Sequence, residues 1–193
     1  LLNIVGEGMR GGAYEQDTHD MDPKMAAFVA KQYKEFVVGF KVAHFSGPEW
    51  IPVDRAVEAG KLANMPVMID FGGNTPPLPI EELFMKHLRP GDIYTHTYTL
   101  LDGNVRETVV DEATGKVKPF IWDARKRGII FDVGYGGASF NFTQAIPSIK
   151  AGFYPNTIST DLHTGSMNTS MKDQLSVMSK FLLMGMELKS VIR

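Results

Sequence analysis

The rest of the chain is arranged around the stretch Val37-Val38-Gly39-Phe40-Lys41-Val42-Ala43-His44. It is apolar, β-branched and aromatic, and a Phe45-Ser46-Gly47-Pro48 turn closes it, so it predicts a buried β-strand. Lys41 is out of place there, because an isolated buried charge costs too much free energy. Its ammonium must be paired, neutralised or chemically altered, unless the side chain reaches solvent from a strand end. A buried lysine can also act as a base, form a Schiff base or form a carbamate.

Composition limits the classes of function. The 193 residues are 44% hydrophobic and 22% charged, as in an ordinary globular protein, and the net charge is -2. This charge suggests no nucleic-acid partner and no acidic membrane surface, and no apolar run has transmembrane length. We find no signal peptide, and the sequence does not indicate the cellular compartment. The absence of cysteine excludes disulfides and thiolate zinc sites, so His, Asp, Glu or a modified Lys must hold any metal.

Further apolar strands alternate with helical patterns along the chain. Residues 1–6, 66–72, 93–98, 128–134 and 157–163 are the other expected strands, and helices are expected at 22–36, 52–62, 80–88, around 124–125 and at 172–184. A hairpin insertion at 102–121 interrupts this order and is a candidate lid or oligomer contact.

Such βαβ units predict an α/β fold with a parallel sheet in one domain, residues 1–193. A doubly wound sheet and a parallel (β/α)8 TIM-type barrel both fit. The barrel is favoured because polar residues close several strands, and no G-x-G-x-x-G motif opens a helix after a strand. Six units are two short of a barrel, so we expect an incomplete barrel from a longer polypeptide.

The strand ends supply the candidate site residues. Imidazole and carboxylate side chains there can bind Zn²⁺ or Mn²⁺, and such a metal ionises a water that attacks a carbonyl. Singly, each residue has a structural explanation: a hydrogen-bonded histidine, a capping aspartate, a turn former or a core tyrosine. The candidates are Lys41, Asp70, His96, Tyr135, Asp161 and His163.

Four motifs carry a family resemblance. They are Val38-Gly39-Phe40-Lys41, Leu88-Arg89-Pro90-Gly91-Asp92-Ile93-Tyr94-Thr95-His96, Phe131-Asp132-Val133-Gly134-Tyr135-Gly136-Gly137-Ala138-Ser139-Phe140 and Ile158-Ser159-Thr160-Asp161-Leu162-His163. As an ordered set they resemble the amidohydrolase superfamily, and most closely its dihydroorotase-like deacetylase branch. The resemblance runs from about the third to just past the eighth barrel strand. It implies a (β/α)8 barrel that binds one or two divalent metals, usually zinc.

The resemblance also implies roles for individual residues. Lys41 matches a carboxylated lysine that bridges two metals, which would explain a lysine in an apolar strand. His96 matches a ligand of the second metal. Asp161 matches a ligand of the first metal that shuttles the proton of the attacking water to the leaving nitrogen.

The chain departs from the family pattern at three places. Asp70 stands where a histidine ligand is typical, and it can still supply an oxygen ligand. Tyr135 replaces a histidine after Asp-Val-Gly, and we expect it to bind substrate together with Gly136 and His163. The His-x-His pair of the first strand has no counterpart, so these residues alone should bind metal weakly.

Three functions stay open at this stage. The first is a metal-dependent hydrolase of a small-molecule amide or cyclic amide, in the manner of a deacetylase or dihydroorotase. The second is a barrel lyase that uses Lys41 as a Schiff base and needs no metal. The third is a non-catalytic relative whose metal site has degraded through Asp70 and Tyr135.

Overall fold

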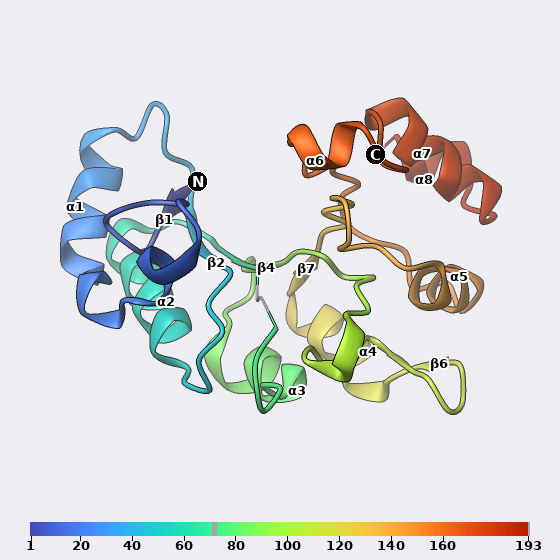
Figure 1. The fold of residues 1–193 in the computed structure, drawn as a ribbon, viewed down its shortest axis with the longest axis horizontal. Helices are drawn as coiled ribbons and strands as arrows, with labels where there is room; N and C mark the ends of the chain where they lie inside the picture. Colours follow the sequence, from blue (N-terminus) through green and yellow to red (C-terminus); the bar gives the residue numbers. More distant parts are fainter. Residues whose placement is uncertain (71–72, 193) are drawn as a thin grey trace. The chain divides into compact units, whose positions relative to one another are not determined.

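The computed structural model describes residues 1–70 and 73–192 (Figure 1). The chain divides into two compact units, Leu1–Ile93 and Tyr94–Arg193. Phe71 and Gly72, the expected end of the 66–72 strand, lie outside the described residues.

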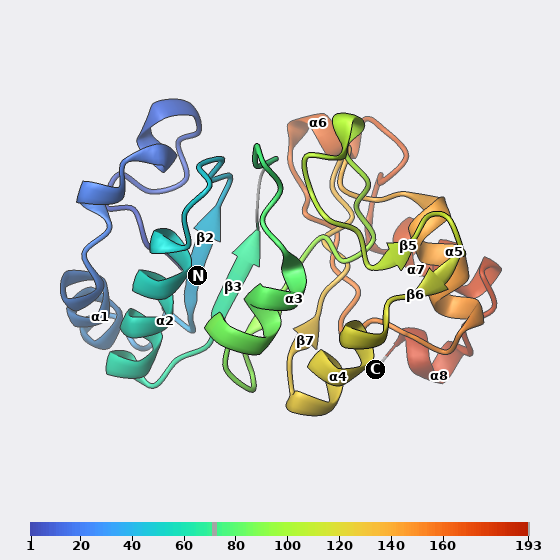
Figure 2. The ribbon, with the colours of Figure 1, turned by 90° about the horizontal axis from the view of Figure 1, so that it is seen from below.

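The first unit contains a parallel sheet. Its strands β1 (Leu2–Asn3), β2 (Phe40–Ala43) and β3 (Val67–Asp70) pair in chain order, with Phe40 opposite Val67 and Ala43 opposite Asp70. Figure 2 shows β2 and β3 side by side. The next strand, β4 (Ile93–Tyr94), lies at the boundary between the units.

Helix α1 (Pro23–Gln32) begins where the sequence predicts. The Asp22 side chain accepts hydrogen bonds from the backbone N–H groups of Lys24 (2.8 Å) and Met25 (3.1 Å), and Pro23 occupies the first helical position. Helix α2 (Ile51–Ala63) packs against α1, β2 and β3. The other helical segments of this unit are η1 (Gly12–Gln16), η2 (Thr18–Asp20), α3 (Ile80–Glu82) and the π-helical turn η3 (Leu83–His87).

The core of the first unit lies between the sheet and its helices. Strands β2 and β3 are buried at three of their four positions each, as expected for parallel strands covered on both faces. The fully buried side chains include Phe40, Ile69, Ile80, Leu83 and Phe84. Lys41 is therefore a cation in a strand that is otherwise part of this core.

The second unit combines one short strand, a hairpin and several helices. Strand β7 (Ile130–Phe131) follows α4 (Pro119–Arg127), as the sequence predicts. The antiparallel hairpin of β5 (Val110–Asp111) and β6 (Lys116–Val117) packs against α5 (Phe142–Lys150), as Figure 2 shows. The remaining elements are η4 (Asp102–Asn104), α6 (Thr164–Met167), α7 (Gln174–Leu183) and α8 (Leu188–Val191).

The expected strand at 157–163 is not a regular strand. A single parallel bridge joins Asp132 to Thr157, and the N–H groups of residues 133, 135 and 136 then donate to the carbonyls of residues 157, 159 and 160. The extended conformation is broken because Gly134 (φ 48°), Gly136 (φ 56°) and Asp161 (φ 49°) are left-handed. The two segments therefore run side by side without a continuous ladder.

Aromatic rings form much of the core of the second unit. Phe131 and Phe153 meet edge to face with centroids 5.1 Å apart, and Tyr98 donates a hydrogen bond to the Phe153 carbonyl. Burial of Tyr98 raises the pKa of its hydroxyl well above the usual value. In the part of the chain that the structure describes, every helix is too short or too polar to cross a membrane.

Candidate functional site

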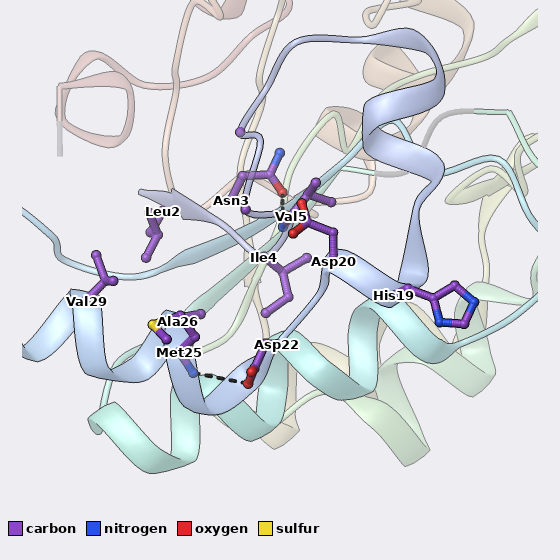
Figure 3. Close-up of a pocket in the computed structure, with 12 residues that line it drawn as sticks. Leu2, Asn3, Ile4, Val5, His19, Asp20, Asp22, Met25, Ala26 and Val29 are labelled. Atoms are coloured by element: carbon purple, nitrogen blue, oxygen red, sulfur yellow. Dashed lines mark hydrogen bonds between the residues drawn. The ribbon is translucent and has the colours of Figure 1, made fainter.

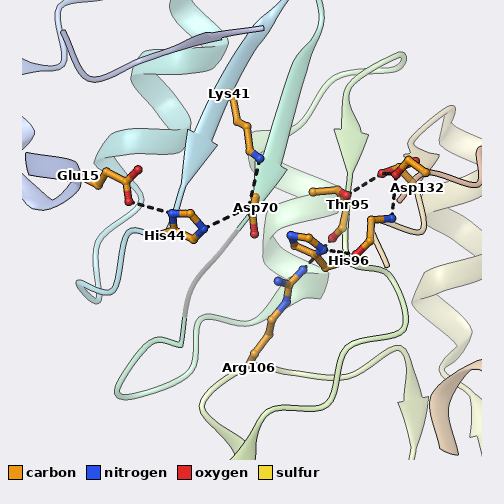
Figure 4. A network of polar contacts seen from close by, with 10 residues as sticks. Glu15, Lys41, His44, Asp70, Thr95, His96, Arg106 and Asp132 are labelled. Atoms are coloured by element: carbon orange, nitrogen blue, oxygen red, sulfur yellow. Dashed lines mark hydrogen bonds and ion pairs between the residues drawn. The ribbon is translucent and has the colours of Figure 1, made fainter. Parts of the chain in front are cut away.

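Lys41 is paired with a carboxylate in the first unit. Strand β2 presents its amine toward the end of β3, where Nζ lies 3.3 Å from Oδ2 of Asp70 (Figure 4). Only 13% of the Lys41 side chain and 5% of the Asp70 side chain are exposed. From the sequence, the Lys41 amine could be paired, neutralised, modified or exposed. The structure shows a partly buried ion pair with Asp70.

Two residues that sequence reasoning missed extend this pair. The ring of His44 places Nδ1 2.9 Å from Oε2 of Glu15 and Nε2 3.8 Å from Oδ2 of Asp70 (Figure 4). The Glu15 side chain is fully buried, and its other oxygen, Oε1, has no hydrogen-bond partner among the described residues. His44 could have been found as the polar residue that closes the lysine strand, whereas Glu15 lies in a polar loop and gives no such signal.

His96 is a buried residue of the second unit, 5% exposed and left-handed at φ 54°. Its Nδ1 lies 2.5 Å from the carbonyl oxygen of Gly134, so the ring donates its proton there. In the neutral ring, a proton on Nδ1 places the lone pair on Nε2. Histidine ligands of metals are commonly oriented in this way.

Asp161 lies against the same short segment as His96. A Cβ added to Gly134 would lie 2.7 Å from Nδ1 of His96, and one added to Gly136 would lie 2.8 Å from Oδ2 of Asp161. Alternate glycines therefore let the backbone of residues 134–136 approach both side chains. Asp161 is exposed whereas His96 is buried.

Asp132, which follows strand β7, supports this segment, and the sequence motif that contains it predicted no role for it. It is 4% exposed and accepts hydrogen bonds from three hydroxyl groups. No sequence signal distinguished it from an ordinary polar residue at a strand end.

Tyr135 and His163 make structural contacts. Tyr135 is 2% exposed and stacks on Phe140, with ring centroids 4.3 Å apart, and the amine of Lys180 lies 4.7 Å above its ring. His163 caps α6 by accepting a hydrogen bond from the Gly165 N–H at Nδ1. A role of Tyr135, Gly136 or His163 in substrate binding stays a prediction.

A pocket of about 530 Å³ lies elsewhere in the first unit, between β1 and α1 (Figure 3). None of the predicted site residues lines it. Its wall includes Leu2, Asn3, Ile4, Asp20, Asp22, Met25 and Val29.

The donors of the second unit fit part of a divalent-metal site. No group of three or more His, Cys, Asp or Glu side chains that could hold a metal occurs among residues 1–70 and 73–192. His96 and Asp161 supply an oriented imidazole and an accessible carboxylate, which are ligand types that zinc and manganese take. Because zinc takes about four ligands, these two residues account for part of a coordination sphere only.

Comparisons with known proteins relate the chain to deacetylases. It is 32% identical over 181 residues to a deacetylase of Brucella anthropi, 31% over 185 residues to a deacetylase of Agrobacterium fabrum, and 29% over 205 residues to a deacetylase of Enterococcus faecalis. These matches cover 90%, 92% and 100% of the chain, but only 42%, 42% and 53% of the relatives. The chain thus spans about half the length of these relatives. No protein-family profile matches it.

Two solved structures share the fold. A crystal structure of an adenine deaminase matches with a TM-score of 0.86 and 25% identity, and one of a dihydroorotase with 0.79 and 27%. Each match covers 100% of this chain and 52% or 50%, respectively, of the solved one. The predicted α/β fold, part of a (β/α)8 barrel with a parallel sheet, is thereby confirmed.

Proposed function

Because this chain belongs to the amidohydrolase superfamily, we propose that the protein hydrolyses the C–N bond of an amide or a cyclic amide. The deacetylase relatives and the adenine deaminase and dihydroorotase matches support hydrolysis at such a bond. The activity proposed is that of the whole protein, since the chain spans about half of its relatives. The observation that carries the proposal is that His96 and Asp161 lie against one glycine segment, residues 134–136.

The proposal includes one or two divalent metal ions, with zinc as the expected ion. His96 and Asp161 are the candidate ligands of the second unit, and Lys41 and Asp70 those of the first. A divalent ion held by such residues polarises a carbonyl and lowers the pKa of a water molecule. This chain supplies two of the groups. The imidazole of His96 donates its Nδ1 proton to the Gly134 carbonyl, and the carboxylate of Asp161 is exposed to solvent.

Asp161 carries the proton transfer in this proposal. Its carboxylate accepts a proton from the attacking water and passes it to the leaving nitrogen, so that the amide is cleaved to an acid and an amine. The exposed position of Asp161 supports this role, because substrate and water must both reach the group.

The assay that tests the proposal measures hydrolysis of N-acetylated amides and of a cyclic amide such as dihydroorotate. We expect activity that a chelator removes and Zn²⁺ restores, and a loss of about 100-fold or more in Asp161→Asn. Asp123→Asn is the control, since Asp123 is a surface residue whose side chain is 59% exposed. Hydrolysis that is insensitive to chelators and to the Asp161 change would contradict the proposal. Protein that neither binds metal nor turns over substrate would instead indicate a non-catalytic relative.

The most specific part of the proposal is a carbamate on Lys41. A neutral amine attacks CO₂ to form the carbamate anion and releases a proton, so the negative charge of Asp70 beside Nζ opposes the reaction. With ¹³C-labelled bicarbonate, we expect a carbamate carbon signal that Lys41→Met abolishes and Asp70→Asn strengthens. A signal that persists in Lys41→Met would assign the modification to another amine.

The Schiff-base lyase is disfavoured. The relatives are named deacetylases, and the matching solved structures are of an adenine deaminase and a dihydroorotase, so the comparisons favour hydrolysis over a lyase reaction. Borohydride trapping of a carbonyl compound on Lys41 would favour the lyase over the hydrolase.

A further inference from the structure

Asp132 is the most heavily hydrogen-bonded carboxylate near the proposed site residues of the second unit. Its Oδ2 accepts hydrogen bonds from Oγ1 of Thr95 (2.7 Å, Figure 4) and Oγ of Ser159 (2.7 Å), and its Oδ1 accepts one from Oγ1 of Thr157 (2.6 Å). The side chain is almost completely buried. A buried carboxylate with three short hydroxyl contacts is held in one position.

The residues around Asp132 are sequence neighbours of the proposed ligands. Thr95 directly precedes His96, and Ser159 precedes Asp161 by two residues. The Asp132 backbone is also fixed, because its N–H donates to the Tyr94 carbonyl and its own carbonyl accepts from the N–H of Thr97. The carboxylate therefore ties together the segments that carry both ligands.

From Asp132, hydrogen bonds on the two sides of Gly134 lead to His96. Ser159 donates its hydroxyl proton to Asp132, and the same oxygen accepts the N–H of Gly134 at 3.0 Å. The carbonyl of Gly134 in turn accepts the Nδ1 proton of His96. Because the hydroxyl proton of Ser159 is committed to Asp132, its oxygen is left to accept from Gly134.

We propose that Asp132 is a positioning residue that sets the orientation and tautomer of His96 through Ser159 and Gly134. The inference rests on the proposed function in one respect: the orientation of His96 would serve to direct Nε2 toward a metal ion. The effect on the ring itself exists without metal and without substrate.

The two oxygens of Asp132 provide a matched control. Ser159→Ala removes a hydroxyl from the Oδ2 side and breaks the path to His96, whereas Thr157→Val removes a hydroxyl from the Oδ1 side and leaves the path intact. Each change deletes one hydrogen bond to the same buried carboxylate, and Ser159→Ala also removes the acceptor of the Gly134 N–H. If Asp132 acts through Ser159, Asp132→Asn should resemble Ser159→Ala and differ from Thr157→Val.

The test is ¹⁵N NMR of the imidazole rings in metal-free protein, which has 5 histidines, with His96 assigned from His96→Gln. We expect the Nδ1–H tautomer at His96 in the unsubstituted protein and in Thr157→Val, and a shift toward Nε2–H in Ser159→Ala and in Asp132→Asn. Zn²⁺ affinity should fall about 10- to 100-fold in Ser159→Ala relative to Thr157→Val.

An Nε2–H tautomer in the unsubstituted protein, or equal tautomer ratios in Ser159→Ala and Thr157→Val, would overturn the proposal. Should Asp132→Asn fail to fold, the comparison of Ser159→Ala with Thr157→Val still tests the path through Ser159. Because the ring spectra need no turnover, a missing hydrolase activity would refute the proposed function while leaving this result standing.

Discussion

The partly buried pair of Lys41 and Asp70 shows how a single residue can be explained by its partner. A cation in an apolar strand is costly until an anion approaches it, and the 3.3 Å contact supplies that anion. Removing one member leaves the other partly buried and uncompensated, which is more costly than replacing both.

Asp70→Asn should therefore lower the free energy of unfolding by about 3 kcal/mol. Because uncharged replacements need no counter-charge, the double variant Lys41→Met with Asp70→Asn should lie within about 1 kcal/mol of the original protein. Urea denaturation monitored by circular dichroism measures both. If the double variant is no more stable than Asp70→Asn alone, the ion pair is not the reason for the loss.

Gly136→Ala tests the close approach of backbone and carboxylate at Asp161. The added Cβ would lie 2.8 Å from Oδ2, so the side chain must move, and hydrolysis should fall strongly. The left-handed backbone adds a stability cost of about 1 kcal/mol.

Gly115→Ala is the matched control for this change. Gly115 is also left-handed, at φ 66°, but nothing lies within 4 Å of its added Cβ. It should show a similar loss of stability with unchanged hydrolysis. Equal losses of activity in the two variants would show that backbone strain, rather than displacement of Asp161, is responsible.

At the scale of elements, local signals in the sequence predicted some helices and missed others. Asp22 and Pro23 together predict the start of α1 because each acts within the first turn. Helix α5 was missed although Asn141 caps it, since Pro147 lies inside it and proline ordinarily ends a helix. The irregular 157–163 segment was missed for a different reason, because left-handed glycines on the neighbouring segment are not visible in its own pattern.

The N-terminus of α7 should be sensitive to acid. The backbone N–H of Ser176 donates to the Asp173 carboxylate and lowers the pKa of Asp173 below its usual 3.8. A carboxylate whose pKa is depressed in the folded state contributes stability above the unfolded pKa. That contribution is lost as the pH falls from about 3.8 through the lower folded pKa.

Asp173→Asn keeps the cap, because asparagine caps helices as well as aspartate does, but removes the charge. The protection of α7 amides from hydrogen exchange, relative to an unfolded chain at the same pH, should fall below about pH 4 in the original protein and should change less in the variant. A fall in protection of the same size in both proteins would assign the acid sensitivity to another group.

At the scale of the whole molecule, the sequence predicted which residues close the strands but not which of them are partners. His96 and Asp161 were chosen from strand ends, and the second unit brings both to residues 134–136. Glu15 and His44 were missed because their contact joins positions 29 residues apart, through a loop without a local pattern. Long-range polar contacts of this kind depend on the packed structure rather than on neighbouring residues.

Metal binding should be visible in the stability of the whole protein. Zn²⁺ at about 100 times its dissociation constant adds about 2.7 kcal/mol to the free energy of unfolding. For a chain of this size, that raises Tm by roughly 5–10 °C. The rise should vanish with a chelator and in His96→Gln but persist in His19→Gln, because His19 is an exposed histidine. An equal rise in both variants would place the bound ion elsewhere.

The unequal exposure of His96 and Asp161 affects how a catalytic cycle would end. A carboxylate in contact with bulk water can also exchange protons with the buffer, so solvent can take the proton that Asp161 accepts from the attacking water before it reaches the leaving nitrogen. The ring of His96 is only 5% exposed and donates its Nδ1 proton to the Gly134 carbonyl. Buffer composition should therefore affect the recovery of the carboxylate while leaving the imidazole unchanged.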